Sequence, residues 1–275
     1  MKRNKIKKLG IYVALILCLI IVLTPVYWIA TTSIKTERDA FATPPKWVNF
    51  HPIFDNYKSL FIEAEFFRFF LNSFIVSMGT MCISLICGIP TAYAFSRLRF
   101  RGKTGLFFWV LFTRIAPPMG FVLPFFLIYR NLHLLDTKIG LIVVYLTFNL
   151  SLVIWMMTTF FRDIPRDIEE AAMIDGASTL QVFTRVVLPL SVPSLTTVAI
   201  FSFLFSWNEF LYALILTRNT AKTAPVVITS FLTRVGIGWG QISAGMVILI
   251  IPVIGFSFIT RKYLVRGLLG GAIKG

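Results

Sequence analysis

The sequence predicts an all-α integral membrane protein with six transmembrane helices. Of its 275 residues, 57% are apolar, 28 are Phe and only 14% are charged, which is far from the composition of a soluble domain. Apolar runs long enough to cross a bilayer recur six times, with polar segments between them. The expected spans are residues 9–30, 69–95, 106–129, 140–161, 194–217 and 242–260.

The first span follows five basic residues within residues 1–8. Its 22 uncharged residues, 9–30, would form a helix about 33 Å long, which is enough to span. Tyr27 and Trp28 lie near its far end, where interfacial aromatic residues belong. A cleaved signal peptide is the alternative, but the apolar run is long for one and no A-x-A site follows it. We therefore expect residues 9–30 to be the first span.

The later spans are interrupted or separated by recognisable signals. Pro117-Pro118 and Pro124 are expected to break the third span, because proline removes a backbone donor from a helix. The connecting loops are residues 31–68, 97–103, 130–139, 162–193 and 218–241.

The distribution of Lys and Arg predicts the orientation. Six spans put both termini on one side, and loops on that side hold 16 basic residues against 10 on the other, with Arg114 inside a span. The positive-inside rule therefore places both termini in the cytoplasm. The expected organisation is a cytoplasmic N-terminus (1–8), a transmembrane domain (9–260) and a cytoplasmic tail (261–275).

Composition and motifs exclude several other classes. The net charge of +15 is explained by basic cytoplasmic loops, and no nucleic-acid-binding motif accompanies it. Three cysteines, Cys18, Cys82 and Cys87, lie inside apolar runs and show neither a disulfide framework nor a metal site. No metal or nucleophilic constellation is present, which argues against a membrane enzyme.

A phosphate-binding loop is nearly mimicked by Gly102-Lys103-Thr104, but Arg97 stands where the first glycine of the motif is required. The chain is therefore not expected to hydrolyse ATP by this device.

Residues 162–193 form the longest charged segment after residue 70, between two apolar runs. Pro165 suits the first position of a helix, and Gly176 is placed to end that helix in a left-handed conformation. Ser178 and Gln181 have the spacing of a capping box, which predicts a second helix. Pro189 and Pro193 are expected to interrupt the chain before the next span. A short acidic helix with small residues suits docking, and a solvated loop helix is the alternative.

The amino-acid sequence of this segment resembles the EAA loop of ABC importer permeases. The matching residues are Glu170-Ala171-Ala172, Asp175-Gly176-Ala177 and Leu188-Pro189. In that family the loop is a coupling helix that sits in a cleft on a cytoplasmic ATPase. The resemblance implies ATPase contacts at Glu169, Glu170, Ala171, Ala172, Asp175 and Gly176.

Three further stretches resemble the six-span permeases of carbohydrate importers, of the kind of the second maltose-type permease. They are residues 134–137 (LLDT), 207–210 (WNEF) and the glycine-rich tail 267–275. The resemblance implies the type I ABC importer permease fold with a cytoplasmic coupling helix. It also implies that the tail reaches between ATPase subunits through Gly270, Gly271, Lys274 and Gly275.

The implied function is import of a sugar, oligosaccharide, polyol or glycoside by alternating access in a bacterial or archaeal cytoplasmic membrane. The implied partners are a second, different permease, two copies of an ABC ATPase and an extracytoplasmic solute-binding protein, besides membrane lipid. ATP and Mg²⁺ would bind to the ATPase subunits, so no cofactor is expected in this chain.

Two charges inside spans are candidates for the solute path, Arg114 and Glu209. A charge at that depth usually faces a cavity or a partner, because burial in lipid costs a few kcal/mol or more. A structural ion pair, or a side chain that snorkels to the headgroups, is the alternative.

Other path candidates are Pro117, Asn149, Trp207 and Asn208. An interrupted helix exposes backbone groups that only protein or water can satisfy, which favours a cavity near Pro117. Trp207 beside Asn208 offers an apolar plate next to an amide, which suits a sugar ring. Ordinary packing and interhelical hydrogen bonding are the alternatives for these residues.

Three other functions remain open on the sequence. A permease for a non-carbohydrate solute differs only in details of the tail and of residues 207–210. An ion-coupled secondary transporter would need intramembrane carboxylates, for which Glu209 is the one candidate. A membrane scaffold would not require Arg114 or a broken third span.

Overall fold

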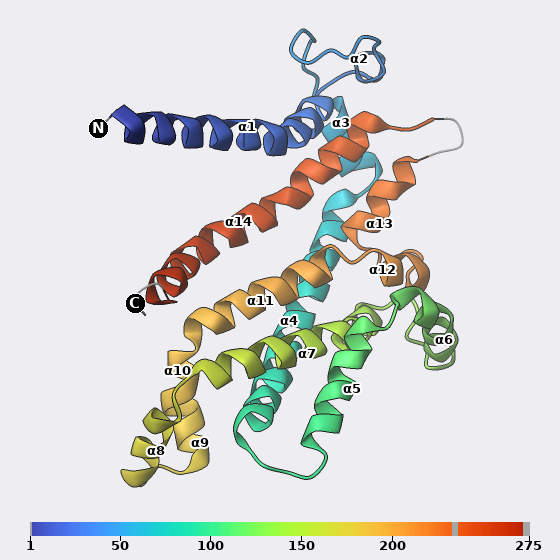
Figure 1. The fold of residues 1–275 in the computed structure, drawn as a ribbon. Coiled ribbons are helices and arrows are strands. Elements are labelled where there is room, and N and C mark those ends of the chain that lie inside the picture. The colour runs from blue at the N-terminus through green and yellow to red at the C-terminus, as the bar shows by residue number, and fades with distance from the viewer. Residues whose placement is uncertain (1, 233–235, 272–275) are drawn as a thin grey trace. The chain divides into compact units, whose positions relative to one another are not determined.

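A computed structural model describes residues 2–232 and 236–271, and these residues are mostly helical (Figure 1). The expected all-α fold is confirmed. The longer helices are α1 (Lys2–Thr32), α4 (Phe66–Arg97), α5 (Lys103–Ile115), α6 (Pro118–Asn131), α7 (Lys138–Asp163), α11 (Val192–Trp207) and α14 (Trp239–Gly271). The shorter helices are α2 (Glu37–Ala40), α3 (Asp55–Lys58), α8 (Arg166–Ile174), α9 (Thr179–Val182), α10 (Leu188–Leu190), α12 (Leu211–Leu216) and α13 (Ala224–Ile228). Ser59–Glu63 and Phe183–Val187 are π-helical turns, and Thr229–Phe231 is a 3₁₀ turn.

Four of these helices, α1, α4, α7 and α14, are each long and apolar enough to cross a membrane. The number rises to six if each of two bent helix pairs counts as one span. The first pair is α5 with α6, bent by 93°, and the second is the segment Thr179–Leu190 with α11, bent by 77°. The expectation of six spans therefore requires two of them to be broken.

The third span breaks at one place only. Helix α5 ends at Ile115, Pro117 is extended with φ −65° and ψ 122°, and α6 begins at Pro118. Proline is compatible with this position because the first turn of a helix does not use its backbone donor. Pro124 lies inside α6, which continues to Asn131, so the expected second break at Pro124 is wrong.

The fifth span also differs from the expectation. Residues 194–217 form two helices, α11 and α12, separated at Asn208–Phe210, and the sequence analysis did not predict this interruption. Pro189 lies in the first turn of α10 and does not stop the helical path. The bend comes instead at Ser191, just before α11, and Pro193 lies in the first turn of α11.

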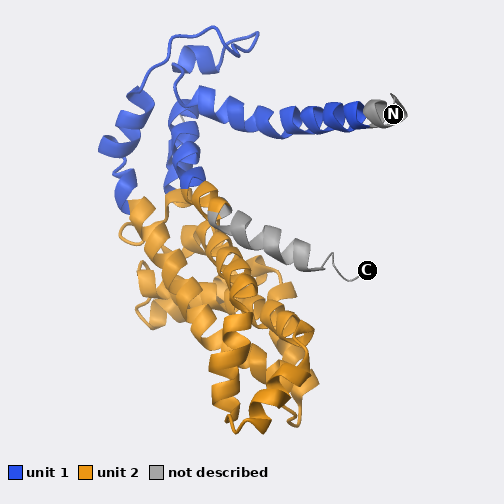
Figure 2. Cartoon of the chain, turned by 90° about the vertical axis from the view of Figure 1, so that its left-hand side faces the viewer, with its two compact units in different colours: residues 1–68, 227–251 blue, residues 69–226, 252–275 orange. Residues whose placement is uncertain are grey.

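The chain divides into two compact units (Figure 2). Unit 1 comprises residues 1–68 and 227–251, and unit 2 comprises residues 69–226 and 252–275.

In unit 1, a buried lysine organises the segment that follows α1. Lys35 donates to the backbone carbonyl of Lys46 at 2.6 Å, and its ammonium lies 4.1 Å from the centre of the Trp28 ring. The Asn56 amide donates to the carbonyls of Ser33 and Lys35 at 3.0 and 2.9 Å. A buried cation is thus satisfied by a carbonyl and an aromatic face rather than by a carboxylate.

In unit 2, helix α7 is central, and half of its membrane-spanning stretch is buried within the chain. It packs against α5, α11 and α12. One core cluster surrounds Tyr145 and includes residues of α4, α6 and α12. A second surrounds Phe161 and includes residues of α4, α9, the π-helical turn Phe183–Val187 and α11. The two clusters fix residues 166–190 and the broken spans to the same central helix.

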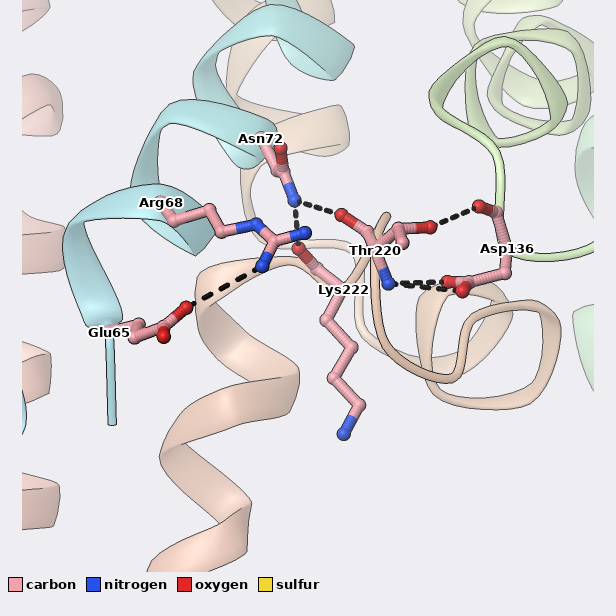
Figure 3. Close-up of polar contacts among 6 residues, drawn as sticks. All are labelled: Glu65, Arg68, Asn72, Asp136, Thr220 and Lys222. Atoms are coloured by element: carbon pink, nitrogen blue, oxygen red, sulfur yellow. Dashed lines mark hydrogen bonds and ion pairs between the residues drawn. The ribbon is translucent and has the colours of Figure 1, made fainter. Parts of the chain in front are cut away.

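Asp136 joins two segments of unit 2 that are far apart in sequence (Figure 3). Its carboxylate accepts the backbone N–H groups of Arg218, Asn219, Thr220 and Ala221 at 3.0 to 3.2 Å. The Thr220 hydroxyl also donates to the Asp136 carbonyl at 2.8 Å. We call this arrangement the Asp136 latch.

Asn72 of α4 completes the attachment of this segment. Its amide donates to the carbonyls of Thr220 and Lys222 at 2.8 and 3.0 Å. The Ser73 hydroxyl accepts the backbone N–H of Ala224 at 2.8 Å. The segment after α12 is therefore held from two sides through its backbone.

The latch also determines the charge state of Asp136. Burial raises the pKa of this carboxyl, but the N–H groups of Thr220, Ala221 and Arg218 outweigh that effect and hold the pKa well below its usual range. A depressed folded-state pKa means that the carboxylate stabilises the fold above the ordinary Asp range. This contribution is lost as the pH falls through the folded-state pKa.

We expect Asp136→Asn to lower the melting temperature of the purified protein, with a loss on the order of 2 kcal/mol, because the hydrogen bonds go to a charged acceptor. Asp136 has φ +57°, and Asn tolerates this left-handed conformation, so backbone strain does not confound the comparison. Asp163→Asn, at an exposed carboxylate, is the matched control. Equal melting temperatures for the two variants would contradict a stabilising latch.

Candidate functional site

The segment that follows α7 has the local structure that its sequence predicts. Helix α8 starts at Arg166 and carries Asp167 and Glu169 in its first turn, so Pro165 is the N-cap and not the first helical residue that the sequence predicted. Gly176 ends it with φ +89°, a left-handed conformation that favours glycine. The capping box is present in both directions between Ser178 and Gln181, at 2.8 and 3.4 Å. Two helices joined by a tight turn therefore project from the end of α7.

One face of this pair is anchored in the core of unit 2. Val182 and Val187 are fully buried in the cluster around Phe161, and Ala172 and Ala177 pack against that cluster. The opposite face is exposed and carries Glu170, Ala171, Asp175 and Gly176. The EAA-like residues therefore divide into an exposed group and a buried group.

Glu169 belongs to the buried group. Its carboxylate forms an ion pair with the Arg97 guanidinium and accepts the Tyr93 hydroxyl at 3.0 Å. The two charged side chains are only 9% and 6% exposed. The resemblance implied that Glu169 contacts the ATPase. In this structure its carboxylate is turned into the chain and already bonded, so the side chain is not placed for direct contact.

Arg97 makes a second contact that fixes the start of α8. Its guanidinium donates to the carbonyl of Ile164 at 2.8 Å, in the turn between α7 and α8. Tyr93 packs edge-on against Phe161, with ring centres 5.8 Å apart, and so ties the pair to α7. We call Arg97, Glu169 and Tyr93 the anchor of α8, and it joins α8 to the end of α4.

Arg114 lines a cavity at the break between α5 and α6. The cavity has a volume of about 310 Å³ and is lined by Trp109, Phe112, Thr113, Arg114, Ala116, Pro118, Phe121, Phe125, Thr147, Phe148 and Tyr212. The Arg114 guanidinium lies 5.1 Å from the Phe205 ring centre and 5.9 Å from that of Trp155. Within the described residues it forms no ion pair with Glu209, so aromatic faces take the place of a carboxylate.

The walls of this cavity are bridged by hydroxyl groups that the sequence analysis did not single out. The hydroxyls of Thr113 and Ser151 are hydrogen-bonded at 2.7 Å, which joins α5 to α7. The Tyr212 hydroxyl donates to the carbonyl of Pro118 at 3.4 Å, one residue after Pro117. Pro117 thus contributes the break, while Pro118 and Tyr212 form the wall.

Two other path candidates lie in the core instead. Asn149 is fully buried, and its side-chain amide links α7 to α11. The amide nitrogen donates to the Ser206 hydroxyl at 2.9 Å, and the amide oxygen accepts the Ser202 hydroxyl at 2.9 Å. Trp207 is 1% exposed and stacks on Phe203 with ring centres 5.5 Å apart. In this structure both residues take the packing role that the sequence analysis gave as the alternative.

Asn208 and Glu209 lie at the break in the fifth span, between the end of α11 and the start of α12. The exposed Asn208 ends α11, and its amide donates to the carbonyl of Leu204 at 2.9 Å. The Glu209 carboxylate accepts the N–H groups of Tyr212 and Ala213 at 2.8 and 3.2 Å and so caps α12. Glu209 reaches the cavity only indirectly, through Tyr212.

The remaining expected sites are at the tail. The backbone of Gly270 and Gly271 continues α14, whereas Lys274 and Gly275 lie outside the described residues. Within the described residues no group of three or more His, Cys, Asp or Glu side chains could hold a metal ion.

We expect Arg97→Gln to destabilise the attachment of α8, because it leaves the Glu169 charge buried without an opposite charge at a cost of about 3–5 kcal/mol. The double variant Arg97→Gln/Glu169→Gln removes both charges and should recover much of this loss. Melting temperature and hydrogen exchange of the amides of residues 166–174 measure the effect. A double variant no more stable than the single one would contradict the anchor.

Comparison with known proteins gives a consistent result. Residues 83–269 match the family model described as binding-protein-dependent transport system inner membrane component. The trehalose transport system permease protein SugB of Mycobacterium tuberculosis is 40% identical over 259 residues, covering 92% of this chain and 93% of that protein. The trehalose/maltose transport system permease protein MalG of Thermococcus litoralis is 32% identical over the full length of both chains.

A solved structure is similar throughout. A chain of a bacterial ABC transporter involved in import of the acidic polysaccharide alginate superposes with a TM-score of 0.74 and 26% identity, covering 96% of this chain and 98% of that one. The chain therefore belongs to the family of inner membrane components of binding-protein-dependent transport systems.

Proposed function

We propose that this chain is one of two different permease subunits of an ATP-driven importer for a carbohydrate-type solute. The observation that carries the proposal is the coupling segment, in which α8 is anchored on one face and exposes Glu170, Ala171, Asp175 and Gly176 on the other. Relatives named for trehalose, maltose and alginate transport support the solute class.

The proposed mechanism is alternating access without covalent chemistry in this chain. Two cytoplasmic ATPase subunits bind ATP and Mg²⁺ and receive the exposed face of α8 in a cleft. Their closure on ATP draws the coupling helices together, and the anchor transmits this displacement to α4. An extracytoplasmic binding protein delivers solute on the other side, and both termini lie in the cytoplasm.

The cavity beside Arg114 is the proposed part of the solute path in this subunit. Aromatic rings and a guanidinium suit a sugar, because apolar ring faces stack on aromatic side chains while hydroxyl groups accept charge-assisted hydrogen bonds. The cavity volume, about 310 Å³, leaves room for a monosaccharide-sized group rather than a long chain. The second permease supplies the rest of the path.

Two other functions are less well supported. A permease for a non-carbohydrate solute would use the same coupling segment, and only the solute can separate the two. An ion-coupled transporter would need a free carboxylate in the membrane. The Glu209 carboxylate is occupied by two backbone N–H groups, which counts against that use.

We expect the complex purified through this chain in mild detergent to contain one copy of the chain, one different permease and two ATPase copies. Glu170→Lys should lose the ATPase subunits, or their stimulation by solute, because it reverses a charge on the exposed docking face. Asp55→Lys, an exposed carboxylate in unit 1, is the control. A chain recovered alone, or unchanged ATPase in the Glu170→Lys complex, would contradict the coupling role.

We expect Arg114→Met to raise the solute concentration for half-maximal ATPase stimulation by about tenfold or more, because it removes a charged hydrogen-bond donor from the cavity. Trehalose and maltose are the first solutes to test. Arg130→Met, at an exposed arginine outside the cavity, should leave this concentration unchanged. An unchanged value for Arg114→Met would exclude the cavity from the path.

A further inference from the structure

Five basic side chains lie where α4 turns into α5 and where α7 passes into α8. They are Arg99, Arg101, Lys103, Arg162 and Arg166, which we call the basic rim. All of them except the half-buried Lys103 are exposed. The coupling role does not account for them, since the anchor uses Arg97 and the exposed face of α8 uses other residues.

These residues come from three helices, α5, α7 and α8, and from the turn before α5. The Arg162 guanidinium, in the last turn of α7, lies 5.8 Å from the centre of the Phe107 ring of α5. Lys103 lies one turn before Phe107 on the same side of α5. The positive charges of Arg162, Arg166 and Arg99 all act on the Lys103 ammonium. Lys103, Arg162, Arg166 and Arg99 therefore form a single site of concentrated positive charge.

The basic side chains of the rim are not paired with carboxylates of the described residues. Within the described part of the chain, none of its five side chains forms an ion pair, in contrast to Arg97, which is paired with Glu169. Asp163 and Asp167 are the carboxylates nearest to Arg162 and Arg166 in sequence, and neither forms an ion pair with them within the described residues. Like charges held together without a carboxylate favour an anion from outside the chain.

The surroundings indicate that this anion sits at the membrane surface. Leu98 and Phe100 alternate with the arginines of the turn and are 46% and 40% exposed. Exposed apolar residues between basic ones are typical of a segment at the boundary between acyl chains and headgroups. Lys103 begins α5, which is half of a bent candidate span, and Arg162 lies in the last turn of the candidate span α7. Basic residues at such helix ends favour the headgroup region of a membrane.

We propose that the basic rim binds the phosphate headgroup of an anionic phospholipid. The guanidinium groups of Arg162 and Arg166 and the ammonium of Lys103 surround the phosphate, while Leu98 and Phe100 contact the lipid chains. A bound lipid neutralises the repulsion between α5 and α7 and so stabilises their junction beside the coupling segment. This inference does not depend on which solute the importer carries.

The test is lipid binding by the purified complex, measured by native mass spectrometry during titration with phosphatidylglycerol. Lys103→Gln/Arg162→Gln should weaken binding of the tightest phosphatidylglycerol by about 30-fold, because each basic residue near the surface contributes about 1 kcal/mol. Phosphatidylcholine, which has no net charge, should bind equally to both complexes. Unchanged phosphatidylglycerol binding would overturn the proposal.

The control is Arg130→Gln/Arg218→Gln, which removes the same charge from exposed side chains outside the rim and should not affect binding. Arg99→Gln/Arg166→Gln, at two exposed side chains beside Lys103, should weaken binding similarly and tests the same site if the first variant does not assemble. Competition of inorganic phosphate with equal strength would assign the site to free phosphate. Loss of ATPase subunits with unchanged lipid binding would assign it to the ATPase. Either result would overturn the lipid assignment.

Discussion

The ion pair between Arg97 and Glu169 is the interaction on which the end of unit 2 that carries α8 depends. A short helix such as α8 is not stable by itself, because nucleation costs more than its few hydrogen bonds return. Packing of Ala172 and a buried, charge-assisted bond to α4 supply what the helix lacks. Because neither charge has another partner of opposite sign among the described residues, a displacement of α8 that leaves α4 behind would expose an unpaired charge to an apolar core. Such a displacement is therefore costly, and the two helices move together.

Buried or partly buried carboxylates also have a structural role elsewhere in unit 2. Breaks in apolar helices leave backbone N–H groups without partners, and in a membrane such groups must be satisfied by the chain itself. Glu209 does this for α12, and Asp136 does it for the segment that follows α12. A carboxylate inside or beside a span therefore need not be a transport site. In this chain the intramembrane guanidinium, which faces a cavity and aromatic rings, is the better candidate.

Local features of the sequence predicted local features of the structure. The capping box of Ser178 and Gln181, the left-handed Gly176 and the break at Pro117 depend on neighbouring residues, and all three are present. The anchor joins residues 72 positions apart, and the latch joins residues more than 80 positions apart. A local sequence pattern therefore could not predict these contacts. The direction of Trp207 and Asn149 likewise depends on how α11 packs on α7. Apolar spans with little periodicity do not reveal which side faces a cavity.

The latch has a consequence for how the exposed surface of this subunit can change. The carboxylate of Asp136 holds the chain through the backbone N–H groups of residues 218–221, and only the Thr220 hydroxyl adds a side-chain contact. The side chains of Arg218 and Asn219 are exposed and take no part in it. Asp136 therefore determines the backbone conformation of this surface, whereas Arg218 and Asn219 determine which side chains it exposes. Substitutions at these two positions can alter what the surface recognises while its backbone stays in place.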